Sequence, residues 1–304
     1  MPQKAAGQKG RQVDGPQAAK PAASTDGAAV TTEDLGLRGP RGWAFRGVTL
    51  DAPAGSLIAL EGPSGSGRTC LLLALTGRMR TTEGTARIGG LRLPKQLAAL
   101  RRISALGHTP GVAELEPALT VAEHLRERAL LQRRFGGSLR GLLRPRSERR
   151  AEARQRVDEA LAAAGLDPAT LPKGLRTAVR DLERTEALRL SIALALIGRP
   201  RLLGVDDTDL KLSDAERAEI WELLAALAGQ GLTVLAVCSE APAGALVVST
   251  APRQESGRST APEDGTRTAP DGGTQADARP EDDSSTTGTT GKENGDALAE
   301  TGRA

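Results

Sequence analysis

The chain has 304 residues, a net charge of +3 at pH 7, and an aromatic content of only 1%, with no Tyr. Few aromatic side chains and a small positive charge disfavour a nucleic-acid partner, because bases stack on aromatic rings and phosphates need a basic patch. Two cysteines give no disulfide framework, no run of about 20 apolar residues is present, and no secretory signal is predicted at the start.

The two ends of the chain differ in composition from the middle. Residues 1–29 are mostly Ala, Gly, Gln, Lys and Pro. Residues 251–304 carry six basic and eleven acidic residues among Gly, Thr, Pro and Ser. Neither end holds enough apolar surface to offset the entropy of ordering, so both are predicted to be disordered tails. Residues 30–250 are then predicted to form one domain.

Residues 57–75 are typical of a strand, a glycine-rich turn and a helix. Leu57–Leu60 form a short apolar run, and GPSGSGRT follows at residues 62–69. This matches the phosphate-binding pattern G-x-x-x-x-G-K-[ST] except at Arg68. We expect the loop to bind nucleotide phosphates through Gly62, Ser64, Gly65, Ser66, Gly67, Arg68 and Thr69. The alternative, an ordinary Gly/Ser-rich connection, is disfavoured by the flanking strand and helix.

Arg68 occupies the position at which such loops carry Lys. Arg keeps the positive charge, but its planar guanidinium is bulkier than a compact ammonium. We therefore expect nucleotide binding to persist while fitness for hydrolysis is in doubt.

A second apolar run ends in two carboxylates. Leu202–Val205 are followed by Asp206 and Asp207. An Asp at the end of such a strand assists Mg²⁺ in phosphoryl-transfer proteins, so Thr69 and Asp206 are the expected metal ligands. An ordinary Asp-Asp turn is the alternative.

From about residue 30 to 250 the chain resembles the ATP-binding subunits of ABC transporters. The segments that carry the resemblance are Gly47–Gly55, Leu119–Leu125 and Ile197–Arg201, together with the loop at 62–69 and the strand before Asp206. The resemblance implies an α/β fold: a P-loop NTPase core of mostly parallel strands, a small β region near its start, and a helical subdomain at about 112–198. It also implies ATP and Mg²⁺ as ligands.

Several catalytic positions of that family are substituted here. Asp207 stands where the family has a catalytic Glu, and Ser239 stands where it has a switch His. His108 replaces a Gln that contacts Mg²⁺ and senses the membrane part, so it is a further candidate metal ligand or sensor. A solvated loop histidine is the alternative for His108. An Asp expected after Leu212 is Ser213.

The family's signature helix, usually Leu-Ser-Gly-Gly-Gln, aligns with residues 182–186, which read Leu-Glu-Arg-Thr-Glu. In the family the Ser hydroxyl and the glycine backbone grip the γ-phosphate held by the opposite subunit. Here Glu183 and Glu186 bring negative charge, and side chains replace the glycines. An ordinary amphipathic helix describes this segment better.

Two features have no assigned role. The basic stretch 132–150 is predicted to be either a solvated insertion or a contact for anionic lipid or a membrane partner. No aromatic residue aligns cleanly with the family's adenine-stacking position, for which Trp43 is the nearest substitute.

The sequence thus predicts an ATP-binding subunit that serves a multi-span membrane subunit encoded separately, with weak or absent hydrolysis. We expect a homodimer or heterodimer of nucleotide-binding domains, cytoplasmic and peripheral on the inner face of the membrane. A slow but active transport ATPase is the alternative. A soluble ABC-like protein acting on ribosomes or DNA is disfavoured by the single cassette, and a small-molecule kinase by the entry strand and the helical subdomain.

Overall fold

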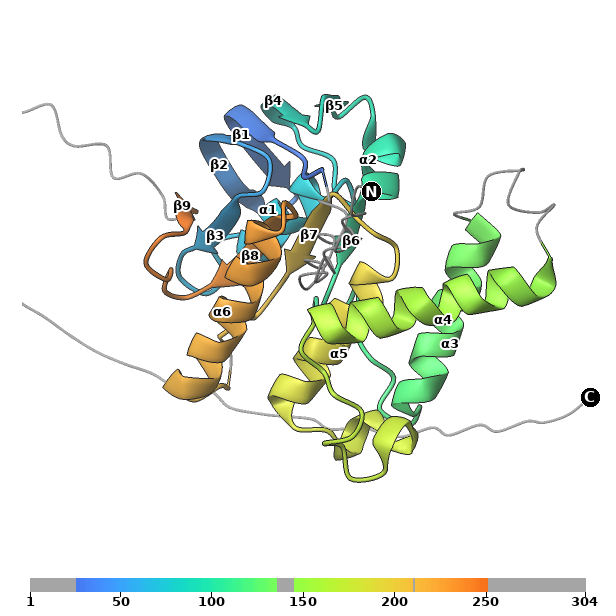
Figure 1. Ribbon diagram of the computed structural model, residues 1–304. Coiled ribbons are helices and arrows are strands. Elements are labelled where there is room, and N and C mark those ends of the chain that lie inside the picture. The colour runs from blue at the N-terminus through green and yellow to red at the C-terminus, as the bar shows by residue number, and fades with distance from the viewer. Residues whose placement is uncertain (1–25, 136–144, 210, 251–304) are drawn as a thin grey trace, which may run out of the picture. The chain divides into compact units, whose positions relative to one another are not determined.

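The computed structural model describes residues 26–135, 145–209 and 211–250 (Figure 1). All of these belong to one compact unit, Met1–Gln254. The expected tails at 1–29 and 251–304 lie outside the described residues, except for residues 26–29. The centre of the basic stretch 132–150 also lies outside them.

A parallel sheet forms the centre of this unit. Its strand order is β6-β7-β8-β3-β9, and every neighbouring pair is parallel. The strands are β3 (Leu57–Glu61), β6 (Ser104–Leu106), β7 (Leu202–Val205), β8 (Thr233–Cys238) and β9 (Leu246–Ser249). All of them therefore end at the same edge of the sheet, where ligands of open α/β folds bind.

A second, antiparallel sheet has the order β2-β1-β4-β5. Its strands are β1 (Val30–Gly39), β2 (Gly42–Ala52), β4 (Glu83–Ile88) and β5 (Leu91–Leu93). It is the small β region that the sequence predicts near the start of the domain, and most of its residues precede the central strand β3 or directly follow the helix after it.

Alternation along the central strands divides the core into two clusters. Ile58 and Leu60 of β3 pack with the antiparallel sheet and the first helix, whereas Ala59 between them packs on the opposite face with the helices α5 (Arg184–Leu196) and α6 (Asp214–Gly229). Strand β8 alternates in the same way. Because side chains of a strand point to opposite faces in turn, a sheet covered on both faces needs apolar residues at nearly every position. This explains the continuous apolar runs in the sequence.

The helices fall into two groups in Figure 1. Three of them, α3, α4 and α5, contact one another and lie within the region predicted to be a helical subdomain. The others lie against or beside the sheets. The bounds are α1 (Arg68–Leu75), α2 (Leu97–Ile103), α3 (Val121–Phe135), α4 (Arg146–Ala163), α5 (Arg184–Leu196) and α6 (Asp214–Gly229), with 3₁₀ turns η2 (Gly174–Arg176) and η3 (Val179–Asp181). The predicted α/β class, with a parallel core and a separate small β region, is confirmed.

The N-terminal boundary differs from the predicted one. Gly27 and Ala28, expected in the disordered tail, are buried. The Ala28 N–H donates to the Arg201 carbonyl oxygen and to the Thr233 hydroxyl, both at 3.1 Å. These small residues carry no hydrophobic pattern, so only their packing against β8 and the residue before β7 shows that they are folded.

The helices of the described residues include none that combines the length and the apolar character needed to cross a membrane.

Candidate functional site

The phosphate loop connects the end of β3 to the start of α1. Gly67 precedes α1 with φ 84°, a left-handed conformation that favours glycine. A Cβ atom on Gly67 would lie 1.9 Å from the Ala44 carbonyl oxygen of β2. The backbone of the antiparallel sheet thus packs directly on the loop, and no other residue fits at 67. The N-terminus of α1 points its free N–H groups toward the loop, as an anion site requires.

Arg68 is the first residue of α1 and is half-buried. Its guanidinium Nη1 donates a hydrogen bond to the Cys238 carbonyl oxygen at the end of β8. The substituted residue of the phosphate pattern is therefore tied to the neighbouring strand. Burial raises the pKa of the Cys238 thiol to about 12, and the charges of Asp209 and Glu61 add to this rise. Cys238 is a neutral core residue here.

Thr69 and Asp206 come together from α1 and the end of β7. The Thr69 side chain lies beside the Asp206 carboxyl. Burial raises the pKa of Asp206, and the Asp207 charge adds to the rise, while the nearby Thr69 side chain, the hydrogen bond from the Asp207 N–H and the charge of Arg68 oppose it. Asp206 is 1% exposed. Its Oδ2 atom is buried without a hydrogen-bond partner among the described residues.

The unpartnered Oδ2 atom of Asp206 indicates that the site could hold Mg²⁺. A buried carboxylate oxygen without a partner is costly unless a cation or a donor satisfies it. Mg²⁺ takes oxygen ligands and is commonly held by one or two carboxylates together with phosphates and waters. A hydroxyl and a carboxylate side by side next to a phosphate loop suit that ion. The described residues contain no group of three or more His, Cys, Asp or Glu that could hold a metal by themselves.

Asp207 and His108 flank Asp206. The backbone N–H of Asp206 donates to the His108 carbonyl oxygen at 2.8 Å, and the Asp207 N–H donates to Asp206 Oδ1 at 3.0 Å. Burial lowers the pKa of His108, and the Arg184 charge lowers it further, while the nearby acidic side chains oppose this. The imidazole is therefore neutral at pH 7. Asp207 has φ 49°, which Asp tolerates better than most residues.

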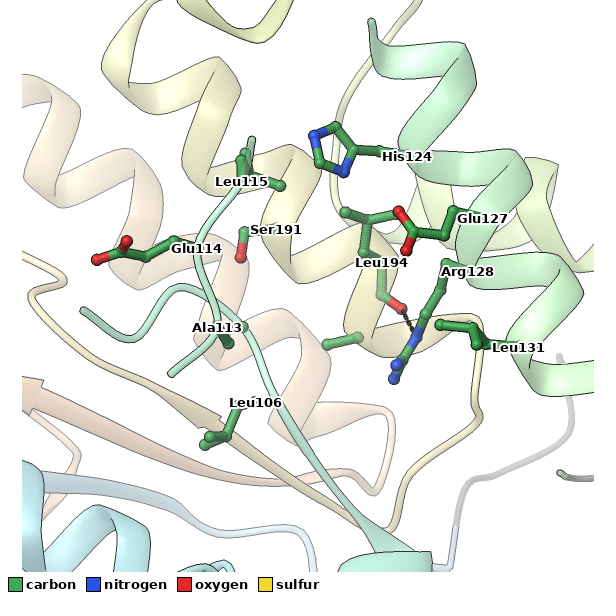
Figure 2. Close-up of a pocket in the computed structure, with 12 residues that line it drawn as sticks. Leu106, Ala113, Glu114, Leu115, His124, Glu127, Arg128, Leu131, Ser191 and Leu194 are labelled. Carbon is green, nitrogen blue, oxygen red and sulfur yellow. Dashed lines mark hydrogen bonds between the residues drawn. The ribbon is translucent and has the colours of Figure 1, made fainter. Parts of the chain in front are cut away.

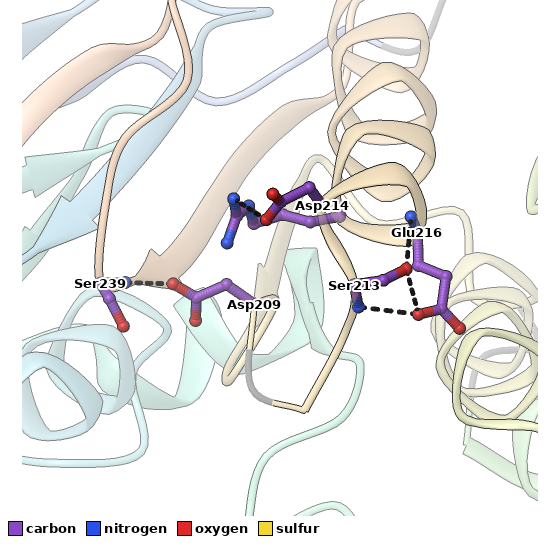
Figure 3. A network of polar contacts seen from close by, with 6 residues as sticks. Asp209, Ser213, Asp214, Glu216 and Ser239 are labelled. Carbon is purple, nitrogen blue, oxygen red and sulfur yellow. Dashed lines mark hydrogen bonds and ion pairs between the residues drawn. The ribbon is translucent and has the colours of Figure 1, made fainter.

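Ser239 follows β8 and is exposed. Its backbone N–H donates to Asp209 Oδ2 at 2.5 Å (Figure 3). One residue before Asp209, the Thr208 hydroxyl donates to the Val237 carbonyl oxygen at 2.8 Å. Side chains from the segment after β7 thus hold the end of β8, and Arg68 holds it from the phosphate loop.

The segment that aligns with the family's signature motif has a local structural role. Glu183 precedes α5 and forms a capping box with Glu186: the Glu183 side chain accepts from the Glu186 N–H, and the Glu183 N–H donates to Glu186 Oε2 at 2.8 Å. The two acidic side chains are therefore folded onto the start of their own helix. Behind them, Leu188 and Ile192 are buried, as the predicted amphipathic pattern requires.

Ser213 has the same role for α6. Its hydroxyl accepts from the Glu216 N–H at 3.3 Å, and its own N–H donates to Glu216 Oε2 at 2.8 Å (Figure 3). The serine at this position starts a helix, because a Ser hydroxyl satisfies one of the free N–H groups of the first turn.

A hollow of about 200 Å³ lies between the segment after β6 and helices α3 and α5 (Figure 2). Arg128 lines it, and its Nε donates to the Leu194 carbonyl oxygen at 3.0 Å. Burial lowers the pKa of the Arg128 guanidinium. Leu131 also lines the hollow and is 42% exposed, beside Leu130 at 53%. The hollow lies where the segment that begins at His108 meets the helices.

The structure brings together the loop at 62–69, Asp206, Asp207 and the backbone of His108 and places Ser239 at the end of the adjacent strand. Two contributors were not predicted from the sequence. Thr250 contacts the loop through Ser66 at 2.6 Å, and Asp209 binds the Ser239 N–H. Neither carries a distinct sequence signal: Asp209 lies four residues after the apolar run that ends at Val205, and Thr250 lies two residues after the run that ends at Val248.

Comparison with known proteins gives the family. The model of a family described as ABC transporter matches residues 45–209, more than half of the chain. Among curated relatives, ABC transporter A family member 10 of Arabidopsis thaliana is 29% identical over 182 residues, covering 60% of this chain and 18% of that protein. Nod factor export ATP-binding protein I of Cupriavidus metallidurans is 31% identical over 186 residues, covering 61% and 54%.

Solved structures agree on the fold. A dimeric ATP-binding cassette in a post-hydrolysis state with ADP and phosphate superimposes with a TM-score of 0.53 at 24% identity, covering 69% of this chain and 88% of that one. A bacterial Atm1-family ABC exporter with ATP bound gives 0.53 at 23% identity, covering 75% and 37%. This chain spans less than a fifth of the plant relative and about half of the bacterial one. The chain belongs to the ABC transporter family and carries that family's nucleotide-binding domain.

Proposed function

We propose that this chain is the ATP-binding component of an ABC transporter complex, that it binds MgATP, and that its hydrolysis is weak or absent. The observation that carries the proposal is the pairing of Thr69 with Asp206, whose buried Oδ2 has no partner among the described residues. Bound Mg²⁺ would neutralise phosphate charge and orient the γ-phosphate. Thr69 and Asp206 would hold the ion, and the loop and the N-terminus of α1 would hold the phosphates.

Four substituted residues support weak hydrolysis. Arg68 donates to the Cys238 carbonyl, so reaching a phosphate would require that bond to be given up. Asp207 is one methylene shorter than Glu, and a displacement of about 1 Å of a catalytic group can reduce the rate on the order of a hundredfold. At Ser239 a hydroxyl replaces an imidazole, and His108 replaces an amide side chain.

The signature segment supports the same conclusion for a dimer. Family sites join one subunit's phosphate loop to the other subunit's signature helix. Here that helix begins with Glu183 and Glu186, which cap it. Two carboxylates and no glycine would face a partner's γ-phosphate, and like charges repel. The chain would therefore not complete the nucleotide site on its partner's loop, and the site on its own loop would also be poorly equipped for hydrolysis.

The alternative is a slow transport ATPase in which Asp207 orients the attacking water. One observation favours it: Asp207 directly follows Asp206 at the edge of the site and is half-buried, so a carboxylate is present where the family has one. The two proposals differ in whether phosphate is released above the background rate.

The proposed partners are a second nucleotide-binding domain and a membrane subunit, which would hold the chain at the cytoplasmic face of the membrane. Relatives named as export or drug-resistance ATP-binding proteins support a transport role. The hollow beside α3 and the exposed Leu130 and Leu131 are our candidate surface for the membrane subunit.

Calorimetric titration of the full chain with MgATP tests nucleotide binding. We expect weak binding that weakens further when Mg²⁺ is removed. Thr69→Val should lose the dependence on Mg²⁺ because it removes the hydroxyl but keeps the side-chain shape, and Thr69→Ser should retain it. A folded wild-type sample that gives no binding at millimolar MgATP would overturn the proposal.

A further inference from the structure

Hydrogen bonds connect the phosphate loop to the ends of β8 and β9, the two strands that lie on either side of β3. Toward β8 the contact is the bond from Arg68. Toward β9 it is made by Thr250, the residue directly after that strand, whose hydroxyl lies 2.6 Å from the Ser66 hydroxyl. The Thr250 N–H donates to the Glu61 carbonyl oxygen at 2.9 Å, which anchors Thr250 at the end of β3.

The Thr250 hydroxyl contacts two oxygen atoms, the Glu61 carbonyl oxygen at 3.2 Å and the Ser66 hydroxyl at 2.6 Å. Either hydroxyl can donate in the contact between the two side chains. When Thr250 donates to Glu61, the Ser66 hydroxyl donates to Thr250, because a hydroxyl has one proton. Thr250 is only 8% exposed, so water competes little for this bond.

Gly62 leaves the space that this contact uses. A Cβ atom at 62 would lie 2.5 Å from Thr250 Oγ1 and 2.6 Å from Ser66 Oγ. The two hydroxyls therefore occupy the position of the missing side chain. Gly62 and Ser66 of the loop thus pack with Thr250, a residue far away in the sequence, at the start of the loop.

We propose that Thr250 is a positioning residue for phosphate binding, acting through the Ser66 hydroxyl. The proposal rests on the proposed nucleotide binding at this loop. Glycines at 62, 65 and 67 give the free loop many conformations, and only a curled one directs its N–H groups at a phosphate. A loop that the Ser66–Thr250 hydrogen bond already holds in the curled conformation loses less conformational entropy on binding. The affinity for MgATP therefore rises without any contact between Thr250 and the ligand.

The test compares Thr250→Val, which removes the hydroxyl and keeps the shape, with Thr250→Ser, which restores it. Thr250→Val should weaken MgATP binding about fivefold, the effect of one hydrogen bond. Thr250→Ser should bind like the wild type. Thr250→Val should lower the midpoint of thermal unfolding by no more than a few degrees, because the Thr250 N–H still satisfies Glu61, and Thr250→Ser should keep the wild-type midpoint. Thr32→Val is the matched control: Thr32 is buried and its hydroxyl donates to Val48 in the other sheet.

A double-mutant cycle separates action through Ser66 from a general loss of packing. If Thr250 acts through Ser66, then Ser66→Ala and Thr250→Val together should weaken binding no more than either change alone. Independent effects that multiply would overturn the proposal, as would wild-type affinity in Thr250→Val.

Hydrogen exchange of the loop amides without nucleotide gives a readout that does not need ATP. Thr250→Val should speed exchange in residues 64–69, Thr250→Ser should restore slow exchange, and Thr32→Val should leave it unchanged. If the wild type binds no MgATP, the proposed function fails and exchange alone decides this inference. Unchanged exchange in Thr250→Val would then overturn it.

Discussion

Arg68 in the phosphate loop donates a hydrogen bond to the carbonyl oxygen of Cys238, so the loop is tied to the end of strand β8. The next residue, Ser239, directly follows β8 and aligns with the family's switch position. Two substituted positions are therefore joined through one backbone carbonyl. The substitution of Lys by Arg changes more than the shape of a phosphate contact, since it adds a bond inside the protein.

Arg68→Lys should bind MgATP more tightly, by about five- to tenfold, because a compact ammonium can turn to the phosphates and make a charge-assisted bond. The same change should lower the free energy of unfolding by about 0.5–1.5 kcal/mol, the loss of one internal hydrogen bond. Calorimetry and urea unfolding measure the two effects. Arg78→Lys is the matched control: Arg78 donates to the Thr76 carbonyl oxygen at 2.5 Å, so it should lose stability only. Weaker binding in Arg68→Lys would contradict this role for Arg68.

Asp206→Asn should stabilise the nucleotide-free protein and abolish the dependence of binding on Mg²⁺. Burial raises the pKa of Asp206 above its usual value of 3.8. The folded state thus holds the proton more tightly than the unfolded state does, and stability is lost as the pH rises from 3.8 through the raised folded value. Asn carries no charge, so its midpoint of thermal unfolding should exceed that of the wild type at pH 7 by a few degrees and converge with it in acid.

Asp214→Asn is the control for that experiment, because the Asp214 side chain is 93% exposed. It should leave the dependence of nucleotide binding on Mg²⁺ unchanged. A lower midpoint in Asp206→Asn at pH 7 would show that the carboxylate already has a satisfying partner.

Restoring the site on the loop should not restore turnover by itself. Arg68→Lys, Asp207→Glu and Ser239→His together leave the Glu183 and Glu186 capping box in place, so the opposite site still lacks its signature helix. Adding Glu183→Ser, Arg184→Gly, Thr185→Gly and Glu186→Gln should be needed. Two glycines near a helix start should lower the free energy of unfolding by about 1–2 kcal/mol. Phosphate-release assays decide this, and full turnover from the first three changes alone would contradict it.

Shortening the chain to residues 24–252 should shift the midpoint of thermal unfolding by no more than a few degrees, because the removed segments have few apolar residues. Starting at residue 31 should cost more. That change removes Ala28, whose N–H bonds to Arg201 and Thr233, and the fully buried Val30. A large loss from 24–252 would mean that one of the tails packs on the domain.

Local patterns predict most of the strands and helices that build the site. The runs at 57–60, 202–205 and 234–238 are continuous and apolar because both faces of the sheet are covered, and each lies in a parallel strand. The sequence also identifies the glycines of the loop and the carboxylates after β7 as site residues, because they come soon after two of these apolar runs. The position of Thr250 does not, because it depends on strand order: β9 lies next to β3, which brings residue 250 to residue 66.

The substituted positions show a second limit to what the sequence alone predicts. Glu183 and Ser213 appear in the sequence as losses of family residues, and the structure shows that each begins a helix through a capping box. A capping box has a sequence signal, with Glu three residues after the cap. An alignment with the family directs attention to the missing residues and not to this local role.

Phosphate release by the unmodified chain at saturating MgATP measures directly whether this nucleotide-binding domain hydrolyses ATP. We expect release close to the background without protein, and the same low rate in Asp206→Asn, since a site with Arg68, Asp207 and Ser239 would hold nucleotide without turning it over. Robust release from the unmodified chain that disappears in Asp206→Asn would show a working ATPase and overturn the proposal of weak or absent hydrolysis.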